Sequence, residues 1–189
     1  MPSPSLDQLV ADLLTGDISS MTRLFEAHDA SPPRVIWSPR PDEVPHEQLR
    51  FLVRYWNEKR LGAALPPASA IDPVEMRPAL GYIMLLDVLD GGIDFRYRLY
   101  GTQIVDRTGV DWTGRLVSEM MAKSYTALFY AAIYRAALTR REAVATVSAS
   151  PRYVAATEWS RVVLPLCDAE GRVTRFLVGN VPGPWRPPA

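Results

Sequence analysis

A β-hairpin pattern at residues 82–102 constrains the fold more than any other feature of the chain. The run YIMLLDVL is almost wholly apolar and is followed by Asp90-Gly91-Gly92, where glycines permit the positive φ angles of a tight turn. The returning stretch, DFRYRLYGT, alternates polar and apolar residues and stops at a glycine. A period of two predicts a half-buried strand whose inner side carries Ile93, Phe95, Tyr97 and Leu99 and whose outer side carries Asp94, Arg96, Arg98 and Tyr100. A slip of one residue would bury both arginines, so the register is strongly constrained.

The rest of the chain supplies helices and three further strands. An amphipathic helix is predicted from His46, in HEQLRFLVRYWNEKR, and a longer helix at residues 122–139. Short helices are expected after the hairpin, before the longer helix. Apolar runs predict three more strands, at residues 143–149, 153–166 and 172–180. Five antiparallel strands with helices gathered in the middle of the chain indicate an α+β fold whose sheet carries its helices on one face.

The first 45 residues have a different pattern. Apolar residues recur at helical spacing from Leu6 to Phe25. The segment from Pro32 to Pro45 contains five prolines, and because proline fixes φ and lacks an N–H, we expect an extended connector outside the sheet. The predicted organisation is a helical extension and proline-rich linker at 1–45, a main domain at 46–181 and a loose proline-rich tail at 182–189.

Five short sequence words resemble a known family. They are YW at Tyr55, IDP at Ile71, DFRYRLYGT, GVDWTGR at Gly109 and LPL at Leu164. Together with the element order, they resemble a bacterial PAS family that was formerly a domain of unknown function, over about residues 48–181. The resemblance implies a sensory or protein-interaction module that can hold a small molecule between its sheet and its helices. It supplies no ligand-binding or catalytic residue that could be carried over.

Composition and charge narrow the class of partner. Lys plus Arg and Asp plus Glu both number 21, so the chain lacks the basic excess typical of nucleic-acid binding, and we expect no such partner. No apolar run approaches the roughly 18 residues needed to cross a bilayer, and the acidic N-terminus does not resemble a signal peptide, so no membrane association is expected. Cys167 is the single cysteine, which excludes an internal disulfide. A cytoplasmic location is predicted.

Histidine and cysteine, which take part in many catalytic and cofactor sites, are scarce in this chain. The two histidines, His28 and His46, both precede the predicted sheet, so neither a haem ligand nor a serine or cysteine triad is expected in the main domain. Cys167 lies at a strand end, far from the NCRFLQ-like helix that flavin-binding light sensors of the PAS type use. No His, Cys and carboxylate group has metal-ligand spacing. We therefore predict a protein that is not an enzyme and has no metal site, and leave its cofactor unassigned.

A group of aromatic and methionine side chains is expected where the sheet meets the helices. It comprises Tyr97, Trp112, Met120, Met121, Tyr125 and Phe129. These residues either fill a packed core or line an apolar pocket in which tyrosine hydroxyls orient a ligand. Arg96 and Arg98 share the outward side of their strand, and either face solvent or lie at the rim of a docking surface for a helix of this chain or a second subunit.

Two functions of different classes remain after these exclusions. The first is a non-catalytic signalling module that binds a small molecule and acts on a signalling protein or through a homodimer. The alternative is a constitutive adaptor or dimerisation protein with a filled core and no ligand. They differ in whether a cavity lies beneath Tyr97 and Phe129.

Overall fold

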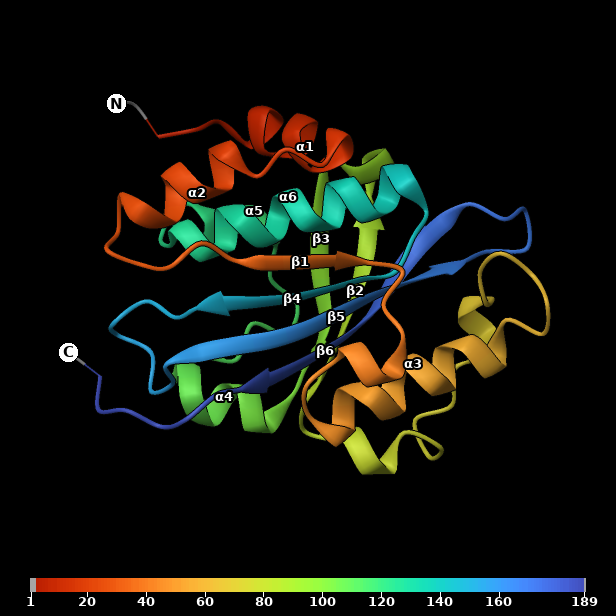
Figure 1. The fold of residues 1–189 in the computed structure, drawn as a ribbon. Coiled ribbons are helices and arrows are strands. Elements are labelled where there is room, and N and C mark those ends of the chain that lie inside the picture. Colours follow the sequence, from red (N-terminus) through yellow and green to blue (C-terminus); the bar gives the residue numbers. More distant parts are fainter. Residues whose placement is uncertain (1–2, 189) are drawn as a thin grey trace.

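A six-stranded sheet forms the centre of the structure, a computed structural model that describes residues 3–188 (Figure 1). Its strands run in the order β1-β4-β5-β6-β2-β3, and every neighbouring pair is antiparallel. The strands are β1 Arg34–Trp37, β2 Ile83–Leu89, β3 Asp94–Tyr100, β4 Val144–Ala149, β5 Glu158–Cys167 and β6 Val173–Pro182. The α+β prediction with a PAS-like antiparallel sheet is confirmed.

Helices occupy both sides of this sheet. They are α1 Leu6–Thr15, α2 Ser19–Glu26, α3 Glu47–Lys59, α4 Thr102–Thr108, α5 Val117–Met121 and α6 Tyr125–Arg140, with short 3-10 turns at Pro41–Glu43, Ala68–Ala70, Arg77–Ala79 and Asp90–Gly92. The predicted hairpin, the helical cluster after it and the long sixth helix are all present. Helices α4, α5 and α6 follow the hairpin in sequence, as expected. Helix α3 packs on the side of the sheet opposite to α6 (Figure 1).

The prediction of five strands is wrong by one, because the proline-rich segment contributes β1. Residues 34–37 pair with β4, with Val35 opposite Thr146. Proline cannot donate to a ladder and is disfavoured in strand interiors, but the stretch between Pro33 and Pro39 has none. It is long enough for a short edge strand. The linker predicted at 1–45 is therefore partly sheet.

A β-bulge changes the predicted alternation of β3. Leu85 lies opposite Leu99 and Leu86 opposite Tyr97, so Arg98 is an extra residue on β3. A bulge of this kind moves every later side chain to the other side of the strand. Phe95 and Tyr97 are buried as predicted, but Leu99 is 43% exposed and Tyr100 only 9% exposed. The predicted inner position of Leu99 and outer position of Tyr100 are both wrong, and Ile93 also lies outside.

The N-terminal helices extend the layer of helices on the inner side of the sheet. In Figure 1, α1 and α2 lie alongside α6, and α1 makes extensive contact with it. Phe25 of α2 packs edge-on against Tyr125 and Phe129, with ring centres 5.2 and 5.3 Å apart. Helix α6 is therefore enclosed by the sheet on one side and by α1 and α2 on the other, which explains why it is apolar around most of its circumference.

Helix α3 covers the outer side of the sheet. A Cβ atom at Gly179 of β6 would lie 2.6 Å from side-chain carbons of Leu49 and of Leu52, so glycine allows α3 to approach β6 closely. Trp56 anchors the same helix, because its Nε1–H donates to the carbonyl of Pro165 on β5 at 2.8 Å. One segment of this chain thus covers much of the surface that the sequence left open for docking.

The C-terminal segment is held by hydrogen bonds, which differs from the loose tail predicted at 182–189. The Thr157 N–H donates to the carbonyl of Pro184 at 2.9 Å. Arg186 Nη2 donates to the carbonyls of Ser150 and Pro151 at 2.8 and 2.6 Å. Up to Arg186, the tail is therefore part of the wall beside the β4–β5 connection.

Candidate ligand pocket

A cavity of about 330 Å³ lies between the inner side of the sheet and the helices. Strands β3, β5 and β6 form its floor, and α6, α5 and the loop after α4 close it. The residues that line it include Tyr97, Tyr100, Trp112, Arg115, Met120, Lys123, Ala127, Tyr130, Tyr153, Trp159, Arg161 and Asn180. Aromatic walls with a few converging polar groups are typical of small-molecule sites.

The structure distributes the six predicted pocket residues over three environments. Tyr97, Trp112 and Met120 line the cavity. Tyr125 instead lines a neighbouring, more polar hollow, where its ring stacks on His28 at 4.2 Å between centres. Phe129 is fully buried, and Met121 packs partly buried against the core, and neither lines either cavity.

Arg161 is the polar group at the floor of the cavity that sequence reasoning missed. It lies on β5, is 5% exposed, and its Nε and Nη1 atoms donate to Asn180 Oδ1 at 3.1 Å and Tyr134 Oη at 2.7 Å. Its guanidinium carbon lies 3.3 Å from the centre of the Tyr130 ring. The sequence signal was a single cation inside the apolar run WSRVVLPL, since arginine is almost never fully buried unless it is paired.

The tyrosines around Arg161 stay protonated near neutral pH. Burial raises the pKa of the Tyr97 hydroxyl well above its ordinary value and that of Tyr100 to about 12. Burial also raises the pKa of Tyr134. The Tyr97 hydroxyl donates to Met120 Sδ at 3.9 Å, a long bond to a weak acceptor. Because a protonated phenol can donate as well as accept a hydrogen bond, Tyr100, and Tyr97 on exchanging that weak contact, can donate to a ligand in the cavity.

Two cations flank Trp112 where the cavity opens. The guanidinium of Arg115 lies 5.2 Å and the ammonium of Lys123 5.6 Å from the centre of the indole ring. Of the described residues that line the cavity, none is an aspartate or a glutamate. The cavity is therefore aromatic in its walls and positively charged at both its floor and its mouth.

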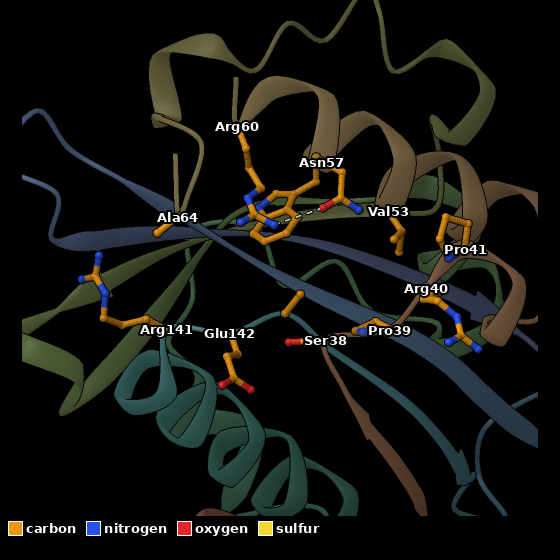
Figure 2. Close-up of a pocket in the computed structure, with 12 residues that line it drawn as sticks. Ser38, Pro39, Arg40, Pro41, Val53, Asn57, Arg60, Ala64, Arg141 and Glu142 are labelled. Atoms are coloured by element: carbon orange, nitrogen blue, oxygen red, sulfur yellow. Dashed lines mark hydrogen bonds between the residues drawn. The ribbon is translucent and has the colours of Figure 1, made fainter. Parts of the chain in front are cut away.

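Figure 2 shows another hollow, of about 310 Å³, between α3 and the segments at 38–41 and 141–143. Its charged side chains already have partners: Arg60 Nη1 donates to Asn57 Oδ1 at 3.3 Å, and Arg141 Nη2 donates to the carbonyl of Gly171 at 2.8 Å. The Arg60 guanidinium also lies over the Trp56 ring. Because Arg141 is exposed and Arg60 is only half-buried, neither presents an unpaired buried charge, and this hollow makes a weaker site than the inner cavity.

Arg96 and Arg98 lie on the outer side of β3, at the edge of the sheet. Arg98 Nη1 is 3.4 Å from Asp87 Oδ2, whose other oxygen pairs with Arg175 Nε at 2.9 Å. Arg96 is exposed and has no ion pair within residues 3–188. The free edge of β3 is partly covered by residues 114–116, since the Tyr97 N–H donates to the carbonyl of Arg115 at 3.0 Å.

The remaining chemistry-bearing residues are engaged elsewhere. His28 Nδ1 is 2.9 Å from the carbonyl oxygen of Leu24, and the Cys167 thiol lies 3.5 Å from the carbonyl oxygen of Pro66. Within residues 3–188, no group of three or more His, Cys, Asp or Glu side chains could hold a metal ion. The same part of the chain has no helix with the length and apolarity to cross a membrane.

A comparison with protein families identifies the chain. The family described as PAS domain matches residues 44–180. This chain belongs to the PAS domain family. PAS domains are generally sensory modules, and they commonly mediate protein interaction.

The chain was also compared with curated proteins and with solved structures. A search of curated proteins found no match. A search of solved structures found similarity to an RNA-binding light-oxygen-voltage receptor, with 17% identity and a TM-score of 0.44. That match covers 94% of the present chain but 58% of the receptor chain.

Proposed function

We propose that this PAS domain is a non-catalytic sensor that binds a small molecule in its inner cavity and signals through protein interaction. The observation that carries the proposal is the cavity of about 330 Å³ between sheet and helices, lined by aromatic rings and by inward-facing polar groups. This size and lining are those of sites that bind small molecules. A constitutive adaptor with a filled core is expected to have no cavity of this size.

Strand β3 offers a short route from the cavity to the surface. Tyr97 lines the cavity, while Arg96 and Arg98, its neighbours in sequence, lie on the outer side of the same strand. A bulge at Arg98 makes the local backbone irregular, and bulges at a sheet edge commonly serve to redirect side chains. We propose Arg96 and Arg98 as part of the surface that contacts a second copy of the chain or a signalling protein.

The first test is whether a small molecule accompanies the purified protein. The protein is denatured, the released compounds are analysed by mass spectrometry, and the same is done for Ala127→Phe, which places a ring in the cavity. We expect a compound in about equimolar amount from the native sequence and a marked loss from the variant, with melting curves showing that both are folded. Equal yields of the compound from both proteins would contradict binding in this cavity, and an empty native protein would favour the adaptor.

The second test addresses the surface of β3. We expect the native protein to sediment as a dimer and the double variant Arg96→Glu/Arg98→Glu to shift towards the monomer, because two acidic side chains replace the basic rim. Both residues are exposed and only a surface ion pair of Arg98 with Asp87 is lost, so the melting temperature should fall only slightly. Arg77→Glu, at an exposed site outside the sheet, is the matched control. Unchanged sedimentation of the double variant would remove this surface from the dimer interface.

A further inference from the structure

The buried cation Arg161 has no counter-ion in this chain. It is 5% exposed, and none of the ion pairs within residues 3–188 involves it. Its contacts are to neutral groups: the hydroxyl of Tyr134, the amide oxygen of Asn180 and the ring of Tyr130. Arginine does not lose its proton in proteins, so a full positive charge stands at the floor of the cavity. Buried charges are normally paired.

Part of the guanidinium is free to bind something else. Arginine has five N–H donors, and here Nε donates to Asn180 and Nη1 to Tyr134. No hydrogen bond joins Nη2 to another described residue, and Nη2 is not among the fully enclosed atoms that lack a partner. Since Arg161 lines the cavity, its unused donors are accessible from that space. A carboxylate can accept two of them at once.

The rest of the cavity has the same preference for negative charge. No carboxylate side chain of the described residues lines it, and the hydroxyls of Tyr97 and Tyr100 stay protonated and can donate. Arg115 and Lys123 stand at the mouth on either side of Trp112. A cleft lined by charge of one sign raises the local concentration of ligands of the opposite sign. The walls, in contrast, are aromatic, with Tyr130 and Trp159 among them.

We propose that the ligand of this PAS domain is a small aromatic carboxylic acid, whose carboxylate pairs with Arg161 and whose ring lies among the aromatic walls. This inference rests on the proposed function, because it specifies what the inner cavity binds. A single buried guanidinium with free donors matches one carboxylate group, and the volume of about 330 Å³ accommodates one ring with a short side chain.

The test compares phenylacetate with phenylacetamide, its neutral counterpart of nearly the same shape. Isothermal titration calorimetry on the full chain, freed of any bound compound by unfolding and refolding, should show phenylacetate binding roughly 10- to 100-fold more tightly, as expected for charge-assisted hydrogen bonds. Equal affinities would overturn the inference and leave the proposed function standing. Absence of binding by either probe at millimolar concentration would also overturn it, while the co-purification experiment would still judge the proposed function separately.

Substitution of Arg161 tests whether this residue causes the preference for phenylacetate over phenylacetamide. Arg161→Met removes the charge and keeps a long apolar side chain, and should lower phenylacetate affinity to that of phenylacetamide while leaving the amide affinity unchanged. Arg161→Lys keeps the charge and should retain part of the preference. A purely structural role of Arg161 predicts that both probes weaken together in the methionine variant, and that result would overturn the assignment. If Arg161→Met does not fold, the lysine variant and the comparison on the native sequence still decide.

Discussion

Phe25→Ala is expected to lower the free energy of unfolding by about 4 kcal/mol, the range found when a buried phenylalanine is replaced by alanine. The ring is fully buried and packs edge-on against Tyr125 and Phe129 of α6. Removing it leaves a cavity between α2 and α6 and takes away two aromatic contacts, each of which contributes beyond its buried area. Chemical denaturation followed by circular dichroism measures the change.

The matched control for Phe25 is Ile18→Ala, at the start of the same helix. Ile18 is 56% exposed, so its truncation should cost about 0.5 kcal/mol or less. If both variants unfold like the native protein, α1 and α2 are not part of the cooperative core. The expected result also bears on the pocket. Because α2 contacts α6, and α6 forms a wall of the cavity, the N-terminal helices would stabilise the ligand pocket.

Trp56→Ala is expected to lower the free energy of unfolding by a similar amount, about 4 kcal/mol. Trp56 is 5% exposed, and its indole N–H donates to the carbonyl of Pro165 on β5. Truncation removes the ring that joins α3 to the outer side of the sheet and leaves that carbonyl without its partner. Thermal and denaturant unfolding should both show the loss.

Trp185→Ala is the control, since Trp185 is 63% exposed and its removal should change stability by about 0.5 kcal/mol or less. Trp56→Phe separates the two contributions of Trp56, because it keeps a ring and removes only the donor, and should cost about 1–2 kcal/mol. Equal stability of Trp56→Ala and Trp185→Ala would show that α3 is not held to the sheet through this side chain.

The elements that the sequence predicted correctly are those set by local patterns. The hairpin at β2 and β3, the helices α3 and α6 and the last three strands all have a periodicity that their own side chains dictate. The predicted start of the second of these strands at residue 153 was too early, because β5 begins at Glu158. The pattern could not indicate β1, because a short edge strand between prolines has too few residues for a period. Nor could it indicate the bulge at Arg98, because alternation looks the same in the sequence whether or not an extra residue is inserted.

The candidate site was predicted in part. Tyr97, Trp112 and Met120 line the cavity, whereas Phe129 points to the layer of α1 and α2, whose position on α6 was not expected. Arg161 was missed because a strand pattern marks it only as one polar residue in an apolar run. Its role depends on Tyr134 and Asn180, which lie 27 and 19 residues away in the chain.

The sequence by itself determined the family, the α+β class and the hairpin whose inner side faces the helices, because hydrophobic periodicity and turn glycines act within a few residues. The tertiary structure decided that α1 and α2 pack on α6 while α3 covers the other side of the sheet. It also decided that Arg161 is buried in the cavity without a carboxylate beside it. Those features depend on residues distant in sequence that meet only when the sheet is assembled, and the free energy of a buried charge depends on all of its neighbours at once.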